Sequence, residues 1–222
     1  LETFLAGAAT DPQARLAIAA LLISVASWMA AQGLFAATRA LYDRGDLDLL
    51  LGSPLSARTV VASKAVAIAT STFGSLALLT MPVANVGALV DRPAWLAVYP
   101  TLIGLVLTAT ALALAISVGL FFLVGARRAR VATSMTGAGI GGAFVLAAQV
   151  IAMLPTELRE RITARVDGAG LVSGADGSSL VWLPIDAVRG DAVAMLALMV
   201  AGVVLFAAAS LLLGERFARA SL

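Results

Sequence analysis

One short charged segment stands apart in an otherwise apolar chain of 222 residues. Residues 42–58, YDRGDLDLLLGSPLSAR, combine three aspartates with leucines at helical spacing. Leu47, Leu50 and Leu51 would share one face of a helix, and the aspartates would point away from it. A glycine follows that can end the helix, and Pro54 cannot continue it. The pattern predicts a short amphipathic helix held between tight turns, which would either lie on lipid headgroups or offer its carboxylates to a protein partner.

Residue types that carry most other site chemistry are absent from the sequence. The chain has no Cys and no His, which excludes disulfides, thiol catalysis, haem ligation and histidine proton shuttles. It also has no phosphate-binding GxxxxGK[ST] motif. The net charge of +2 is small, and the arginines fall in the connections, so no nucleic-acid partner is expected. We predict a protein that is not an enzyme and holds no cofactor or metal.

The composition is that of a membrane protein. Mean hydropathy is +1.00, and only 13% of the residues are charged. Each of five stretches lacks any charge and is long enough to cross a bilayer core, which takes about 20 apolar helical residues. These stretches are apolar all round, which is typical of helices in lipid. They are residues 16–38, 65–90, 93–126, 131–156 and 192–214.

We therefore predict an all-α polytopic bundle in a single transmembrane domain, residues 1–222. The predicted spans are residues 16–37, 59–89, 95–124, 131–154 and 192–213. Pro82 should bend the second span near Leu78, and Pro184 suits a break between a short apolar dip and the last span. Gly137 and Gly141, four residues apart, should let the fourth span pack closely against another helix.

Lysines and arginines near the span ends predict the orientation. One side of the membrane receives nine of these basic residues and the other receives six. The acidic residues are more numerous on the side with six. The cytoplasmic side should hold the loop 39–58, a basic turn with Arg127, Arg128 and Arg130, and the C-terminus. The N-terminus and the segment 155–191 should lie outside.

The predicted spans contain almost no ionisable group, Lys64 near a cytoplasmic end being the exception. A secondary transporter or proton channel needs such groups at membrane depth to bind its coupling ion. The remaining polar residues, such as Asn85, are expected to make interhelical hydrogen bonds. If this protein moves a substrate, its energy must come from another protein.

Two segments resemble one family of membrane proteins. LYDRGDLDLLLGSPLSARTVVASKAVA is similar to the first cytoplasmic loop of ABC-2 type permeases, the membrane subunits of ATP-binding-cassette exporters. VWLPIDAVRGDAVAML is similar to the external segment before their last helix. The order of loops and spans agrees over most of the chain. That family has six spans, so the resemblance implies a further helix before Leu1, and the chain could be one half of a tandem permease.

The resemblance implies a mechanism and partners. The loop would dock on a separate ATPase subunit, and a second permease domain would complete the pathway in a bacterial inner membrane, among lipids. Arg127, Arg128 and Arg130 would make a second cytoplasmic contact. An alternative is a structural or accessory subunit of a larger membrane complex, in which the same loop is a static contact; the substrate is not indicated. The implied coupling residues are Arg44, Asp46, Leu47, Asp48, Leu50, Leu51 and Pro54.

Overall fold

The computed structural model describes residues 12–42, 57–90, 93–155, 157–158, 161, 165, 183–188 and 190–213. All the elements in this part are helical, so the prediction of an all-α fold is confirmed for it. Five helices are long: α2 (Pro12–Tyr42), α4 (Ala57–Val90), α5 (Val98–Val124), α6 (Ala126–Met153) and α9 (Ala192–Ala208). Three are short: the 3₁₀ helix η1 (Pro93–Ala97), α8 (Leu183–Val188) and the π-helix η2 (Ala209–Leu213).

Three segments of the described residues are long and apolar enough to cross a membrane. They are Thr59–Val90, Trp95–Val124 and Ala192–Leu212, and each agrees with a span predicted from the sequence to within one residue. Their mean hydropathies lie between 1.7 and 2.6. The protein is therefore membrane-embedded. The other two predicted spans fall within α2 and α6.

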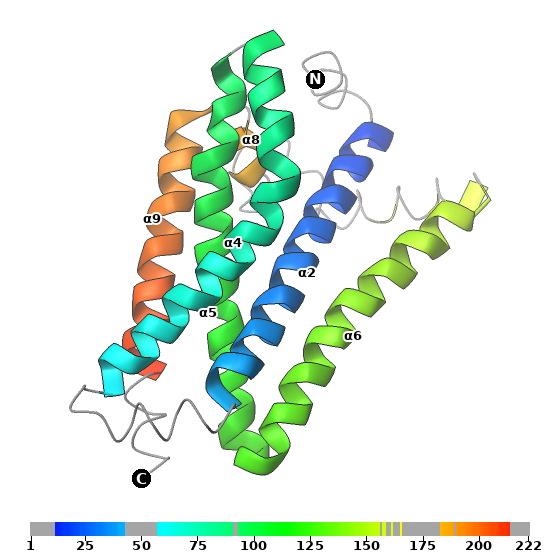
Figure 1. The fold of residues 1–222 in the computed structure, drawn as a ribbon. Coiled ribbons are helices and arrows are strands. Elements are labelled where there is room, and N and C mark those ends of the chain that lie inside the picture. The colour runs from blue at the N-terminus through cyan, green and yellow to red at the C-terminus, as the bar shows by residue number, and fades with distance from the viewer. Residues whose placement is uncertain are drawn as a thin grey trace.

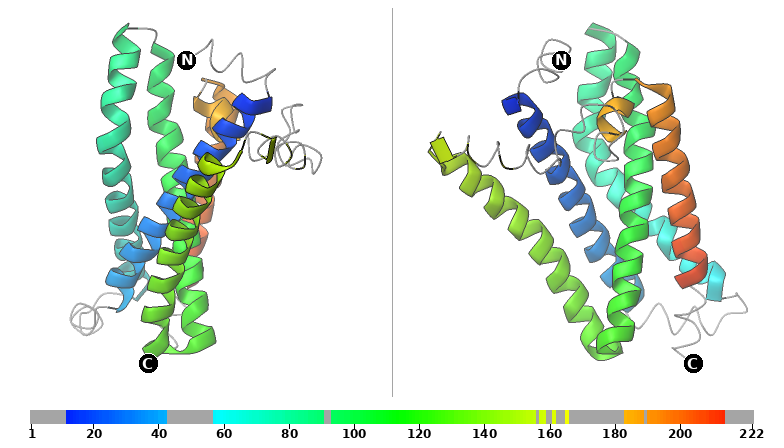
Figure 2. Two further views of the ribbon diagram at one scale, coloured as in Figure 1. Left: turned by 90° about the vertical axis from the view of Figure 1, so that its right-hand side faces the viewer. Right: turned by 180° about the vertical axis from the view of Figure 1, so that it is seen from behind.

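The long helices form a bundle around α5, which contacts α2, α4, α6 and α9 (Figure 1). Successive long helices run in opposite directions, and the short helix α8 lies between α6 and α9 in the chain. The helices α2, α5 and α9 therefore run one way, and α4 and α6 run the other. The helix α6 contacts α2 and α5 near its start and then diverges from the bundle (Figure 2).

Glycines bring the helices close at their crossings. A Cβ atom on Gly202 of α9 would lie 2.6 Å from the carbonyl oxygen of Gly104 on α5. A Cβ on Gly33 of α2 would lie 3.0 Å from Cβ of Ala113 on α5. Helix association in lipid gains from such close backbone approach, because apolar burial alone gives little advantage over lipid contact. The small residues therefore hold α2 and α9 against the central helix.

The helix α4 continues through Pro82 and changes direction along its length (Figure 1). Proline leaves one carbonyl without its usual helical partner and favours such a change. Three serine hydroxyls also donate to the carbonyl three residues earlier, which is a common cause of helix bending. These serines are Ser63, Ser71 and Ser75.

The helices α4 and α5 form a hairpin at the end opposite to the start of α4. Tyr99 donates a hydrogen bond of 2.7 Å to Oδ1 of Asn85. Gly87 lies so close to the indole ring of Trp95 that a Cβ at residue 87 would overlap it. These two contacts fix the register of the hairpin near its turn.

The last long helix begins with a side-chain cap. Oδ1 of Asp191 accepts hydrogen bonds from the amides of Val193 and Ala194, at 2.8 and 3.1 Å. Gly190, with a φ of 94°, turns the chain between α8 and this cap. Pro184 lies in the first turn of α8, where its missing amide proton costs nothing. Ile185 and Ala187 bury that helix against the bundle.

Candidate functional site

Each of the five long helices has one end that the sequence predicts to be cytoplasmic. These five ends lie together at one end of the bundle. There α2 ends, α4 begins, α5 turns into α6 and the π-helix η2 ends (Figure 1). Tyr42 and Ala57 flank the segment 43–56, so the chain leaves and re-enters the bundle at this end. The predicted coupling residues lie in that segment, outside the described residues: Arg44, Asp46, Leu47, Asp48, Leu50, Leu51 and Pro54.

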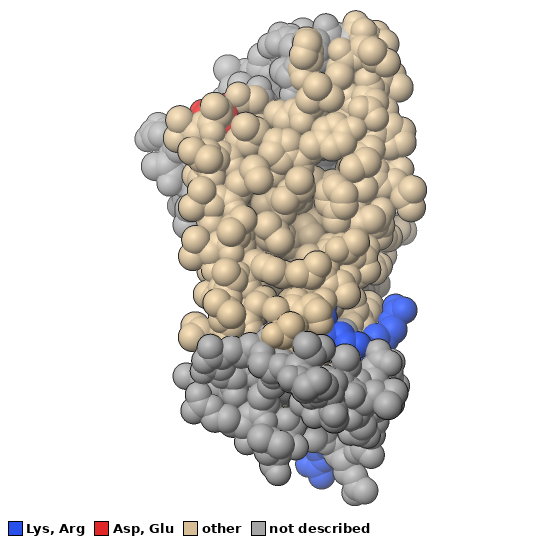
Figure 3. Space-filling model, turned by 60° about the vertical axis from the view of Figure 1, so that its left-hand side comes forward, with Lys and Arg blue, Asp and Glu red and all other residues tan. Residues whose placement is uncertain are grey.

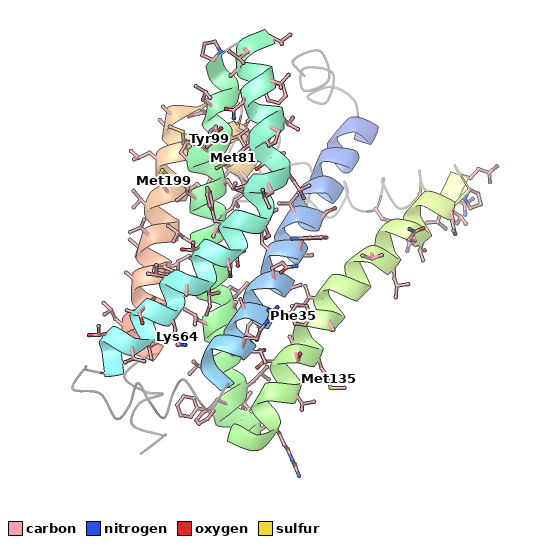
Figure 4. The ribbon with its side chains drawn as sticks, in the orientation of Figure 1. Phe35, Lys64, Met81, Tyr99, Met135 and Met199 are labelled. Atoms are coloured by element: carbon pink, nitrogen blue, oxygen red, sulfur yellow. The ribbon has the colours of Figure 1, made fainter. Side chains whose placement is uncertain are left out.

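The charged side chains that the structure describes at this end are all basic. Arg39 of α2 and Arg128 of α6 are exposed, and Lys64 of α4 is partly buried. Lys and Arg side chains are visible near this end in Figure 3, and Lys64 lies on the first part of α4 in Figure 4. The far end carries both signs of charge on the described residues Glu157, Arg161, Arg165, Asp186 and Asp191. The described charges are therefore distributed unevenly along the bundle axis.

The start of α6 combines a positive helix end with positive side chains. Its sequence begins ARRAR, with no acidic residue in its first turn. The amide end of a helix carries a partial positive charge, so arginines there are unfavourable by about 0.3 to 1 kcal/mol each unless an anion is near. Of the three predicted contact residues, Arg128 has an exposed side chain, and Arg127 and Arg130 lie in the same turn, their side chains outside the described part. This turn therefore suits a negatively charged partner.

A single residue separates α5 from α6. Gly125 has a φ of 76°, a conformation that favours glycine, and its amide donates to the carbonyl of Phe121 at 3.0 Å. The amide of Arg128 in turn donates to the carbonyl of Gly125 at 3.2 Å. These bonds fix the direction in which α6 leaves the turn, and with it the position of the arginines.

The two glycines predicted to pack helices lie on the face of α6 that meets α2. A Cβ on Gly137 would lie 3.3 Å from Cβ of Leu34 and 3.5 Å from the carbonyl oxygen of Ala31. A Cβ on Gly141 would lie 3.5 Å from Cβ of Ala31. The ring of Phe35 also borders this contact (Figure 4). The helix that follows the basic turn is thus held against α2 by a close contact that spans about one helical turn.

Hydroxyl groups inside the bundle bond mostly to their own helices. This differs from the interhelical bonds expected from the sequence, because a Ser or Thr side chain reaches the carbonyl three or four residues earlier without any second helix. The Tyr99 to Asn85 bond does join two helices. Hydroxyls that bond to their own helix include those of Thr38, Ser63, Ser71, Ser75, Thr80, Thr101, Thr108 and Thr136.

Four buried hydroxyls have no hydrogen-bond partner within the described part of the chain. They belong to Thr72, Thr110, Thr133 and Ser210. Buried polar groups without a partner are rare in proteins and need a physical explanation. No group of three or more acidic side chains that could hold a metal ion occurs among the residues described.

No protein-family model, curated protein or solved structure matches this chain.

Proposed function

We propose that the chain is the membrane-spanning domain of an ABC-2 type exporter, which a separate ATPase subunit drives from the cytoplasm. The observation that carries this proposal is the composition of one bundle end. The acidic segment 43–56 begins and ends there, beside the exposed cations Arg39 and Arg128 and the glycine turn. A membrane domain whose spans hold no ionisable group except Lys64 near one end needs such a contact with an energy source.

Five spans are part of the proposal. The helices α2 and α6 have 31 and 28 residues, so at about 1.5 Å per residue each exceeds the roughly 30 Å of a hydrocarbon core. The helix α2 contains the charge-free stretch 16–38, and α6 contains residues 131–153 of the charge-free stretch 131–156. Together with the three segments given above, they carry the chain across the membrane five times. The N-terminus then lies on the opposite side from the C-terminus.

The proposed orientation places the basic end in the cytoplasm of a bacterial inner membrane. Lysine and arginine are enriched in cytoplasmic connections. At the basic end the described charges are Arg39, Lys64 and Arg128, without an acid among them, whereas the far end mixes both signs. Acidic segment 43–56 would meet anionic lipid headgroups unfavourably, which favours a protein partner for it.

The proposed mechanism uses the two sides of this segment differently. Leu47, Leu50 and Leu51 would pack toward the helix ends, and Asp46 and Asp48 would contact the ATPase. Arg44 would add a polar contact, and Pro54 would limit the length of the coupling helix. Closure of the ATPase would then act directly on α2 and α4, which flank the segment. The exposed Arg128 and its neighbours would give the ATPase a second contact through α6.

The proposal is tested by reversing the charge of the acidic segment. Asp46→Arg with Asp48→Arg should abolish co-purification of a P-loop ATPase from native membranes and abolish ATP-dependent export. The matched control is Glu157→Arg with Glu160→Arg, which changes the charge equally at the far end and should leave both readouts unchanged. Thermal unfolding of both purified variants is the check on folding, and each should unfold cooperatively near the wild-type Tm.

Two results would contradict the proposal. Normal export and ATPase recovery by the Asp46 and Asp48 variant would rule out docking through these aspartates. Recovery of the wild-type chain in a stable complex that contains no ATPase would support the alternative, a structural subunit of a larger membrane assembly.

A further inference from the structure

Two buried threonines, one on α4 and one on α5, lie between the same two groups of core residues. Positions four residues apart lie on the same helix face. In α4, the buried residues Ile68 and Leu76 lie four residues before and after Thr72. In α5, the buried residues Val106 and Leu114 lie four residues before and after Thr110. These neighbours belong to two buried clusters that each join α4 to α5. The first contains Leu76 and Val106, and the second contains Ile68 and Leu114.

Both hydroxyls are enclosed and lack a protein partner. Thr72 is 1% exposed and Thr110 is 0% exposed, and neither hydroxyl makes a hydrogen bond to any residue that the structure describes. Neighbouring threonines behave differently: the hydroxyl of Thr108 donates to Gly104, and that of Thr80 donates to Leu76. Lipid cannot provide a partner, so each unpaired hydroxyl is unfavourable as it stands.

The layer that holds these threonines lies between the two clusters, inside the bundle. Phe206 of α9 packs against both clusters and closes the layer from that side. Met29 and Ala37 of α2 belong to the same clusters.

We propose that one water molecule binds between the hydroxyls of Thr72 and Thr110. A buried water needs at least two hydrogen-bonding partners, and the two enclosed hydroxyls without a protein partner would supply them. Each hydroxyl can donate to the water or accept from it. The water thereby satisfies both side chains at once and makes their contributions to stability interdependent. This site is independent of the proposed transport function.

The experiment is a double-mutant cycle with Thr72→Val and Thr110→Val on the full chain in detergent micelles. Valine keeps the shape of threonine and removes the hydroxyl. Each single variant should lower Tm by about 2 to 4 °C, because the water loses one partner and the other hydroxyl is left buried. The double variant should lower Tm no further than either single one, because no polar group remains to be satisfied.

The control is Thr108→Val, whose hydroxyl bonds to its own helix, and it should show no coupling to either site. Strictly additive effects of Thr72→Val and Thr110→Val, or a rise in Tm for each alone, would overturn the proposal. A rise in Tm is expected if the hydroxyls have no partner at all. A high-resolution structure of the wild-type chain must also show density for the water; a direct bond between the two threonines would overturn it.

Discussion

Replacing Gly202 by alanine gives the sharpest test of how α5 and α9 are held together. The new Cβ would lie 2.6 Å from the carbonyl oxygen of Gly104 and 3.3 Å from its carbonyl carbon and Cα. These atoms belong to the backbone of a central helix, so no side-chain rotation can relieve the overlap. An ordinary contact begins at 3.4 Å, so the two helices must separate by about 0.8 Å at their crossing.

The expected cost follows from two opposing contributions. Overpacking of this kind costs about 1 to 3 kcal/mol. Alanine is the better helix former, which returns up to about 1 kcal/mol. A net loss of about 1 to 2 kcal/mol in the free energy of unfolding remains for Gly202→Ala. For a chain of this size that corresponds to a fall in Tm of about 2 to 8 °C.

The assay is thermal unfolding of the purified chain in detergent, followed by circular dichroism. Gly119→Ala is the control, because Gly119 lies in α5, the helix that Gly202 contacts, and its Cβ would meet nothing within 4 Å. That variant should keep or slightly raise Tm through helix propensity alone. Equal Tm values for Gly202→Ala and Gly119→Ala would refute the close contact between α5 and α9.

Two further predictions concern the far end and the orientation. Asp191→Ala removes the cap of α9 and should lower Tm by about 2 to 4 °C, whereas Asp191→Asn should retain most of the stability; a silent alanine variant would show that the two bonds to Val193 and Ala194 contribute nothing. Because the chain has no native cysteine, single cysteines can report sidedness. Arg128→Cys should react with an impermeant maleimide only from the cytoplasm and Glu157→Cys only from outside, and the reverse pattern would invert the proposed topology.

The sequence predicted where helices lie better than how they touch. Charges delimit spans along the chain, so the boundaries at residues 59, 95, 124 and 192 agree with the structure to the residue. The position of a glycine at a helix crossing depends on a partner far away in sequence. The pair Gly104 and Gly202 therefore escaped prediction, although both glycines are visible in the sequence.

Local chemistry also overrode one expectation. Interior hydroxyls were expected to bond between helices, but most of those described by the structure bond to the preceding turn, which is always within reach. The cap of α9 could have been found, since Asp191 directly precedes a long apolar run. The predicted coupling residues are part of the segment 43–56, and their role stays a prediction.

The one-residue link at Gly125 has a consequence for how the chain enters a membrane. If one span is inserted into the membrane before the next, a connecting loop must remain outside the membrane between the two insertion steps. Here α5 ends at Val124 and α6 begins at Ala126, which leaves no such loop. We expect the two helices to be inserted together as one hairpin during synthesis, with the arginines after Gly125 retained on the side from which the ribosome delivers the chain.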